Sequence, residues 1–352
     1  MATINLASKY ETKLDERYKL QSRTDSCIGT GYNWEGVNSI KVWSLTSADL
    51  NDYNASAASN RFGTPSEVDD EVNTYQLMKK RSFAKTFDIT NVQDQMFTKR
   101  ANAYLKQMWD EKYVPEIDKH RLQAWANGAG LGKLNGTKLT KGTIMEALLM
   151  ADAALDDAFV PSEGRTFFVR TDIAVATKLA TELAYSQEWV NKAIVRGKIG
   201  EINGNNVITV PKSIMPKGVE FMVKYRGATA DPMKLKMLRA NDNAPGYAGT
   251  LMEGLCRYDA FVLAQKADGI YVYAESDYCD AVTYELSGTS LTLSCSTASA
   301  VIKYTTDGTN PKASSTASTY SAALTVASGD KIRAYASKTG LTNGAISSYD
   351  VE

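Results

Sequence analysis

Residues 38–45, NSIKVWSL, alternate between polar and apolar side chains, and the stretch that follows, TSADLNDYNASAASNRFGTPSEVDDE (46–71), offers almost nothing for a core to bury. The alternation predicts a β-strand, because successive side chains of a strand point to opposite faces. A strand pattern resumes at 72–78 and continues with Phe83, Phe87 and Ile89 on one face. The result is a long projecting hairpin with a polar tip. Since an isolated hairpin is only marginally stable in water, we expect it to lie on a neighbouring molecule.

The two arms of this predicted hairpin carry opposite charges. The acidic residues of the first arm are Glu67, Asp69, Asp70 and Glu71, and the basic residues of the second are Lys79, Lys80, Arg81 and Lys85. Opposite charges on adjacent copies set orientation more than net affinity. We predict that these residues form an inter-subunit contact, the acidic arm of one copy pairing with the basic arm of the next. The alternative is a solvated hairpin whose charges pair within itself. The acidic run lacks calcium-loop spacing, so a cation site is disfavoured.

Helical patterns flank the hairpin on both sides. After it, a helix is predicted from Asn91, which can cap it, to about Trp125, as a rod of roughly 50 Å with a kink at Pro115. Its buried stripe comprises Phe97, Ala101, Tyr104, Leu105 and Met108. Before the hairpin, residues 5–20 carry apolar side chains at four-residue spacing, which predicts a short charged helix that needs another surface to lie on.

The middle of the chain mixes helices and strands. A helix is expected from Thr143, with Glu146 completing a capping box and Leu148, Leu155 and Phe159 facing inward. A strand is expected at 165–170, followed by a helix at 173–185 that Asp172 caps. Two strands at 199–202 and 207–210 are expected to pair around an Asn203-Gly204 turn. Further strands are expected at 219–225, 251–264 and 269–274, the last two joined by a turn at Asp268-Gly269. This is an α+β pattern without βαβ repetition, which disfavours a Rossmann-like fold.

The composition changes after Tyr278 to serine, threonine, alanine and glycine without a helical period. Short alternating segments such as VTYEL, LTLSC, VIKYTT, ALTV and KIRAYA recur, with turn signals such as Asp307-Gly308 between them. Strands at spacings of about 8–12 residues predict a small β-sandwich at 279–352.

Composition excludes several functional classes. The 352 residues suggest two or three domains, and the balance of 40 basic and 40 acidic residues argues against a dedicated nucleic-acid binder. The N-terminal sequence has no apolar signal-peptide core, and no apolar run is long enough to span a membrane. The four cysteines are scattered, which predicts free thiols in a reducing cytoplasm.

No catalytic, cofactor or metal site is predicted. The single histidine, His120, sits in a helical pattern with no nucleophile motif nearby, so we interpret it as a solvated or partner-facing residue. One histidine and dispersed cysteines offer no clustered zinc ligands. Gly128-Ala-Gly-Leu-Gly132-Lys133 follows a helix and lacks the Gly-Lys-Ser/Thr ending of a phosphate loop, which favours a flexible turn. A glycan hydrolase would need two carboxylates about 5–10 Å apart, and no motif supports one.

The order of charged arm, polar-tipped hairpin, long helix and α+β domain resembles the major capsid proteins of tailed bacteriophages, the Hong Kong 97-type fold. The strings that carry the resemblance are ATINLASKYETKLDERYKLQS, VWSLTSADLNDYNASAASNRFGTPSEV, QDQMFTKRANAYLKQMWDEKYVPEIDKHRLQAWANGAG and GKIGEINGNNVITVPKSIMP. The resemblance covers about residues 1–278. It implies an N-terminal arm at 1–37, an extended E-loop hairpin at 38–90, and peripheral and axial domains with a spine helix at 91–278.

The resemblance also implies a function and partners. The chain is expected to be a major capsid protein that self-assembles into hexamers and pentamers of an icosahedral head around double-stranded DNA, contacted non-specifically on the inner face. A portal and a separate scaffolding protein are the other implied partners, because no scaffolding domain precedes the arm. The expected location is the virion, assembled in the host cytoplasm, with no membrane and no enzymatic activity.

The string VIKYTTDGTNPKASSTASTY resembles immunoglobulin-like modules appended to bacterial carbohydrate-active enzymes and surface proteins. On a capsid such a module is expected on the outer surface, with host-surface glycans as a possible partner. Four tyrosines, Tyr304, Tyr320, Tyr335 and Tyr349, offer sugar-stacking faces, although core packing is the favoured use. The alternative function is a bacterial surface or adhesin-type protein with a glycan-binding module, which predicts an export signal that the sequence lacks.

Overall fold

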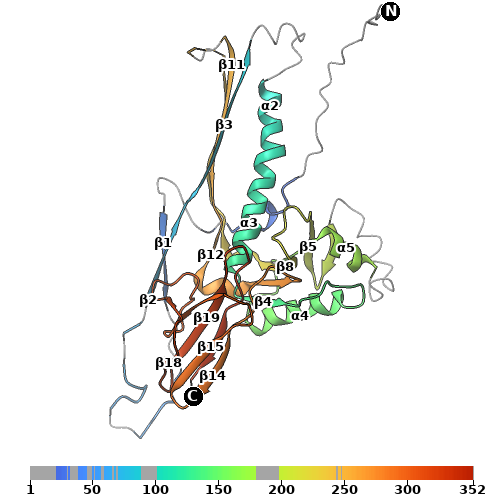
Figure 1. Ribbon diagram of the computed structural model, residues 1–352. Helices are drawn as coiled ribbons and strands as arrows, with labels where there is room; N and C mark the ends of the chain where they lie inside the picture. The colour runs from blue at the N-terminus through green and yellow to red at the C-terminus, as the bar shows by residue number, and fades with distance from the viewer. Residues whose placement is uncertain are drawn as a thin grey trace, which may run out of the picture.

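The computed structural model describes residues 21–29, 31, 39–45, 50, 52–56, 59–65, 67–68, 70–88, 101–179, 198–242, 245–246 and 248–351. These residues form a body (residues 21–278) and a C-terminal β-sandwich (residues 279–351), which we call the sandwich. A long sheet and a long helix extend from the body in one direction, and the sandwich extends in the opposite direction (Figure 1). The helix predicted at 5–20 lies outside the described residues.

The predicted hairpin is formed by β1 (Ser39–Leu45) and β2 (Asp70–Gln76), which pair antiparallel from Ser39 opposite Gln76 to Leu45 opposite Asp70. Its inner face packs on the body, because Ile40, Val42 and Tyr75 contact a cluster that contains Ala230 and Leu263. The described residues between the two strands, 50–68 with gaps, lie at the tip of the hairpin, on the same side of the body as the sandwich (Figure 1).

The second, basic arm is not part of this hairpin, which corrects the expectation from sequence. Residues 79–88 form β3 (Lys79–Asp88), which pairs with β11 (Gly249–Tyr258), and β11 pairs in turn with β10 (Met233–Asn241). All three strands run antiparallel in one long sheet. The partner of β3 lies about 170 residues further along the chain, where no local pattern indicates it.

The long helix is present, with a π-helical turn where a kink was expected. It consists of α2 (Ala101–Met108), the π-turn η2 (Trp109–Tyr113) and α3 (Val114–Gly128). Pro115 lacks an N–H for the helical ladder, and a π-turn is one way to accommodate the missing bond. Aromatic contacts hold α2 to the long sheet, since the Tyr104 ring lies 6.5 Å from Phe83 and 5.6 Å from Phe87. Residues 91–100 of the predicted helix lie outside the described residues.

The core of the body is a six-stranded sheet between two helical layers. Its strands, in spatial order, are β4 (Leu131–Leu134), β13 (Ile270–Ala274), β8 (Val219–Tyr225), β5 (Arg165–Arg170), β7 (Asn205–Val210) and β6 (Lys198–Ile202). One face packs against Leu122 and Trp125 of α3. The other packs against Leu148 and Leu155 of α4 (Ile144–Asp157) and Ile173 of α5 (Thr171–Lys178). The remaining short elements are η1 (Asp25–Cys27), η3 (Arg226–Ala228), β9 (Thr229–Ala230), β12 (Phe261–Val262) and η4 (Ala264–Gly269).

The Asn203-Gly204 turn is confirmed, with φ of 50° and 77° as a two-residue hairpin turn requires. Other local details of this region were wrong. Phe159 is 95% exposed, because the chain leaves α4 before reaching it. The Thr143 hydroxyl bonds to Thr140 rather than capping α4.

Two further sequence predictions in the body are corrected. Asp172 does not cap α5; its carboxylate instead pairs with Arg170 at 2.6 Å and with Lys138 at 2.8 Å. The strands expected at 251–264 and 269–274 do not form a hairpin, since β11 and β13 belong to different sheets.

The sandwich has the predicted all-β form. One sheet contains β14 (Thr283–Ser287), β15 (Ser290–Ser294) and β18 (Leu324–Thr325), and the other β17 (Ser318–Thr319), β16 (Val301–Thr305), β19 (Lys331–Ser337) and β20 (Ser347–Asp350). Its tyrosines pack on the domain itself, as Tyr304 does against Tyr320 and Tyr349 against Tyr284. All four cysteines are free.

Candidate functional site

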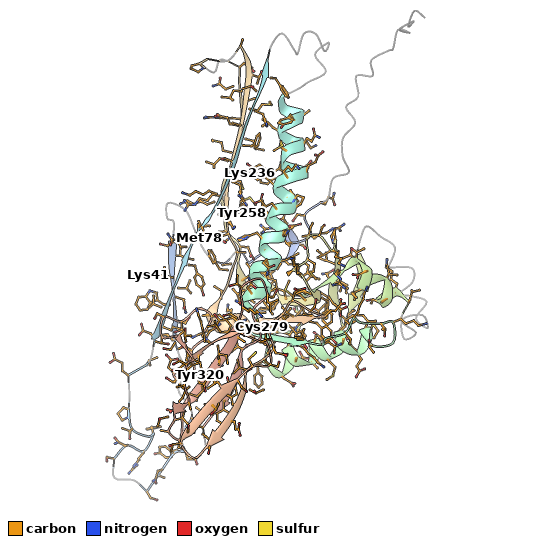
Figure 2. The ribbon with its side chains drawn as sticks, in the orientation of Figure 1. Lys41, Met78, Lys236, Tyr258, Cys279 and Tyr320 are labelled. Carbon is orange, nitrogen blue, oxygen red and sulfur yellow. The ribbon has the colours of Figure 1, made fainter. Side chains whose placement is uncertain are left out.

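The outer face of the β1–β2 hairpin is unusually apolar for a surface. Trp43 and Leu45 are 66% and 68% exposed, and Trp43 stands directly opposite Val72. Lys41 continues the same face toward the body (Figure 2). The tip adds an exposed aromatic pair, because the ring centroids of Tyr53 and Phe62 lie 5.0 Å apart on the surface. Exposed apolar side chains gathered on one face are a feature of protein-binding surfaces, so this face is a candidate interaction surface.

The charges predicted to bridge subunits lie in two separate elements. Glu67, Asp70 and Glu71 belong to the hairpin and its tip, whereas Lys79, Lys80, Arg81 and Lys85 lie on β3 of the long sheet. Asp69 lies outside the described residues. Arg81 forms an ion pair with Glu116 of α3 at 2.5 Å. Among the described residues, no ion pair joins an acidic residue of the hairpin to a basic residue of β3. The inter-subunit contact therefore stays a prediction, now between a hairpin and a sheet.

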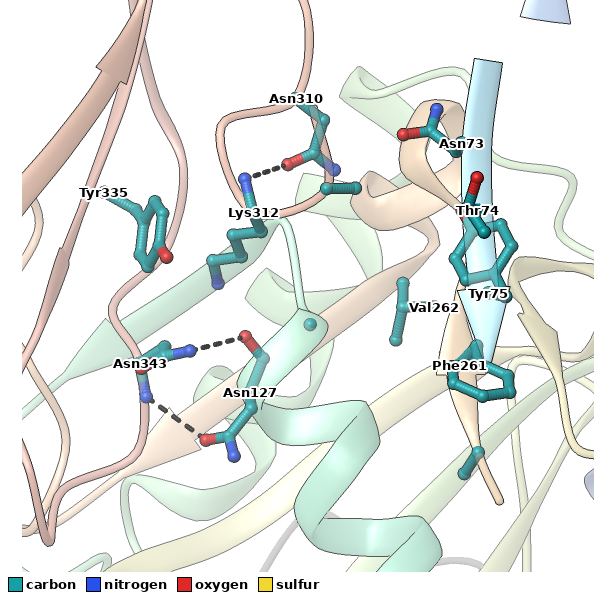
Figure 3. Close-up of a pocket in the computed structure, with 13 residues that line it drawn as sticks. Asn73, Thr74, Tyr75, Asn127, Phe261, Val262, Asn310, Lys312, Tyr335 and Asn343 are labelled. Carbon is teal, nitrogen blue, oxygen red and sulfur yellow. Dashed lines mark hydrogen bonds between the residues drawn. The ribbon is translucent and has the colours of Figure 1, made fainter. Parts of the chain in front are cut away.

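A second site lies where the sandwich meets the end of α3, and we call it the seam. The last carbonyls of an α-helix have no partner within the helix. At α3 the sandwich supplies one such donor, since Asn343 Nδ2 donates to the Asn127 carbonyl at 3.3 Å. Two residues past the helix, the Ile346 amide donates to the Gly130 carbonyl at 2.7 Å. The Asn343 amide also donates to the Asn127 side-chain oxygen at 3.3 Å (Figure 3). The sandwich thus acts as the C-cap of the long helix.

Lys312 provides the charged part of this cap. Its Nζ donates to the Ala129 carbonyl at 2.7 Å and lies 5.3 Å from the centroid of the Tyr335 ring. A cation is favourable at a helix C-terminus, where the dipole is negative. Burial nevertheless lowers the pKa of the Lys312 ammonium from its usual 10.5 to about 7, with the Asp268 carboxylate opposing the shift. The seam therefore holds a lysine whose charged form is favoured by the helix end and disfavoured by burial.

The glycines at 128–132 serve close packing within the body, next to the seam, where a flexible turn was expected from sequence. A Cβ on Gly130 would collide with Asp268, and one on Gly132 would collide with the hydroxyl of Tyr278. Asn310 adds a further bond, its Nδ2 donating to the Ala264 carbonyl at 2.8 Å. Because Tyr278 is buried in the body core and Cys279 in the sandwich core, no flexible linker separates the two domains.

A buried polar network fastens residues 22–29 to the body. The Asp118 carboxylate of α3 accepts hydrogen bonds from the Ser22 hydroxyl, the Arg23 amide and the Thr24 hydroxyl, at 2.6–2.8 Å. Lys224 donates to the Cys27 carbonyl from beneath the Trp125 ring. Burial lowers the pKa of this lysine to about 8. Residues 22–24 are therefore tied to the long helix at Asp118.

His120, predicted to be solvated or to face a partner, has a partner within the chain, and its side chain is 22% exposed. Its Nε2 lies 2.8 Å from Asp259 Oδ1. Burial would raise the pKa of Asp259, but hydrogen bonds from His120 and from the amides of Met78 and Ala260 hold that pKa below its usual value. Within the described residues no group of three or more metal-ligating side chains occurs, and no helix there is long and apolar enough to cross a membrane.

Comparison with solved structures identifies the architecture of the body. A chain from Mycobacterium phage Che8 superposes with a TM-score of 0.63 at 15% identity, covering 77% of this chain and 97% of that one. A chain from the capsid structure of cyanophage P-SCSP1u gives 0.60 at 11% identity, covering 76% and 92%. A chain from the mature capsid of bacteriophage PhiM1 gives 0.58 at 8% identity, covering 76% and 91%. The protein has the phage capsid fold.

The sandwich is an addition to this capsid fold. The family model of the chitobiase/beta-hexosaminidase C-terminal domain matches residues 280–348, almost the whole sandwich. No curated protein sequence matches the chain. Both parts and their order are predictable from the sequence, but the seam is not, because bonds such as that from Asn343 to Asn127 join residues 216 positions apart.

Proposed function

We propose that this protein is the major capsid protein of a tailed bacteriophage and that it self-assembles into hexamers and pentamers of an icosahedral head. The observation that carries the proposal is the capsid fold together with its apolar, projecting hairpin, whose Trp43 and Leu45 have no partner surface within the described chain. A monomer gains nothing from such a surface, whereas a shell buries one copy of it per subunit. Many weak contacts then act together through effective concentration.

The finer expectations belong to the same proposal. The shell encloses double-stranded DNA, a portal and a separate scaffolding protein assist assembly in the host cytoplasm, and the finished location is the virion. The role is structural and not enzymatic, in keeping with the predicted absence of a catalytic site. The sandwich extends from the body opposite to the long sheet, which supports its display on the outer surface (Figure 1). Host-surface glycans are its proposed partner, supported by the chitobiase-type family match.

Negative-stain electron microscopy of the protein expressed alone tests the proposal. Closed shells, tubes or rings of uniform subunits are the expected result. A Trp43→Ser variant should abolish these assemblies, while Lys41→Ser, on the same hairpin face, should leave them intact because it removes no apolar contact. A wild-type protein that stays monomeric at high concentration, both alone and when co-expressed with scaffolding protein, would overturn the proposal.

A further inference from the structure

Phe159 is an aromatic side chain that projects from the end of α4 into solvent. It is 95% exposed, and its φ of 55° lies in the left-handed region that disfavours a bulky residue. The Phe159 amide donates to the Asp156 carbonyl, and the Val160 amide donates to the Leu155 carbonyl. These two bonds form the Schellman motif that ends many helices, and glycine is the usual residue at the position of Phe159. A strained and exposed phenylalanine stabilises nothing within the described chain, which points to a role outside it.

The charges beside Phe159 are acidic. Asp156 and Asp157 lie in the last turn of α4, which has no basic residue, and Glu163 follows in the loop. Negative charge is unfavourable at a helix C-terminus, because the helix dipole is negative there as well. Arg165 compensates Asp156 at 2.6 Å, whereas Asp157 and Glu163 are exposed. We call Phe159 with these three acidic residues the knob, and neither its strain nor its charge favours α4.

A cleft of about 600 Å³ lies along the same helix, between α4 and the strands β4 and β13. Ala147, Met150 and Ala154 line it from α4, and Tyr271 and Tyr273 line it from β13. The two alanines are small, and Met150 is 65% exposed. Aromatic rings pair favourably with one another, so this lining suits an aromatic side chain. We call this space the α4 cleft.

The rim of the α4 cleft is basic. Lys133 and Lys138 line it, and Lys141 lies between two lining residues in the loop that leads into α4. All three lysines are exposed, and Lys138 also pairs with Asp172 at 2.8 Å. Glu146 is the single acidic residue among the described residues of the lining. The knob and the α4 cleft are therefore complementary both in charge and in apolar character.

We propose that the knob of one subunit inserts Phe159 into the α4 cleft of the next subunit. The exposed ring shows that Phe159 does not fill the cleft of its own chain. A contact between two different surfaces is head-to-tail, and repeated copies of it close into a ring when the rotation between subunits permits. A contact between two identical surfaces would instead stop at a dimer. The proposal rests on the shell-building function, and it names one contact within the rings from which the proposed head is built.

Directional cross-linking of the purified full-length chain tests this contact. Asp157→Cys places a thiol beside the knob, Lys133→Cys places one at the rim of the α4 cleft, and a short bis-maleimide joins thiols that lie close together. The double variant should give a ladder of dimers, trimers and larger products on a denaturing gel. Either single variant should give none, and a mixture of the two should stop at dimers. The wild-type chain, whose four cysteines are buried or half-buried, gives the background.

Replacements at the knob and in the α4 cleft test the two halves of the contact separately. Phe159→Gly, added to the double variant, should abolish the ladder and leave the melting temperature unchanged or raised, because glycine is favoured at this helix end. Ser299→Gly is the matched control and should keep the ladder, since Ser299 is also exposed, with φ of 59°, but lies in the sandwich. Met150→Glu should abolish the ladder, because it adds an acidic group where the acidic knob must enter.

Three results would overturn the knob contact: no ladder from the double variant, a ladder that persists with Phe159→Gly, or dimers from either single variant. Electron microscopy of the same preparations separates this test from that of the shell. Shells without a ladder would overturn the knob contact alone, and a ladder without shells would overturn the shell proposal alone. The absence of both would overturn both.

Discussion

Replacing Lys312 by methionine tests whether the sandwich is a structural cap of the long helix. Methionine keeps an unbranched apolar stem next to Tyr335, but it removes the Nζ that donates to the Ala129 carbonyl at 2.7 Å. The carbonyl then stays at a helix end without its donor. Leaving a buried acceptor unpaired costs about 1–3 kcal/mol.

The size of this loss should depend on pH. Burial lowers the pKa of Lys312 from 10.5 to about 7 in the folded protein. Below about pH 7 both folded and unfolded chains carry the proton, so the folded state bears the full cost of the buried charge. Between that pH and 10.5 only the unfolded chain keeps the proton, and this residue makes the protein more stable as pH rises. At about 1.4 kcal/mol per pH unit, the gain by pH 9 is roughly 2–3 kcal/mol.

Urea unfolding of wild type and Lys312→Met at about pH 6 and about pH 9 measures both effects. We expect the variant to be clearly less stable at the higher pH, and the difference to shrink or reverse at the lower pH, where the variant avoids burying an ammonium. Lys338→Met is the matched control, because Lys338 Nζ also donates to a carbonyl, that of Ala298, at 2.7 Å but on the exposed surface. An equal loss for Lys312→Met at both pH values would refute the reasoning.

Three further predictions concern assembly and packing. Trp43→Ser should lower the free energy of unfolding by less than about 1 kcal/mol, because the side chain is 66% exposed, yet remove assemblies from electron micrographs. Replacing Glu67, Asp69 and Asp70 by lysine should block assembly. Replacing Lys79, Lys80 and Lys85 by glutamate in the same chain should restore assembly. Normal assembly of the chain with the three lysine replacements alone would exclude the charge contact. Gly132→Ala should lower the free energy of unfolding by about 1–3 kcal/mol, because its Cβ would collide with Tyr278, while Gly142→Ala, in open space, should not.

Local patterns predicted those elements whose structure is decided by neighbours in sequence. The Asn203-Gly204 turn, the helix that contains Leu148 and Leu155, and the strands of the sandwich all follow from turn chemistry or periodicity within a few residues. The same reasoning placed Phe159 in the core because it extends the apolar spacing of α4. The helix ends at Asp157, however, and the periodicity has no meaning beyond that point.

Pairings between distant segments could not be predicted in this way. The strand pattern of 79–88 is evident in sequence, but nothing local distinguishes β2, its neighbour, from β11, its actual partner. His120 and Asp259 are 139 positions apart, and each has an ordinary solvated interpretation when considered alone. The exposed hairpin could be predicted because its polar tip is visible in one continuous stretch of sequence. The seam could not be predicted, because its hydrogen bonds between the sandwich and the body join residues that are far apart in sequence.

The seam changes how an added domain on this capsid fold should be understood. A module joined by a flexible linker leaves the stability of the body unchanged, and its loss affects only what it binds. Here the carbonyls of Asn127 and of the C-cap residue Ala129, and that of Gly130 just beyond the helix, receive donors from the sandwich. The same helix carries Asp118, which anchors residues 22–24, and its partner sheet contains the basic strand β3. The sandwich therefore stabilises the helix from which the proposed inter-subunit contacts are positioned, so its removal should impair assembly even if it binds nothing.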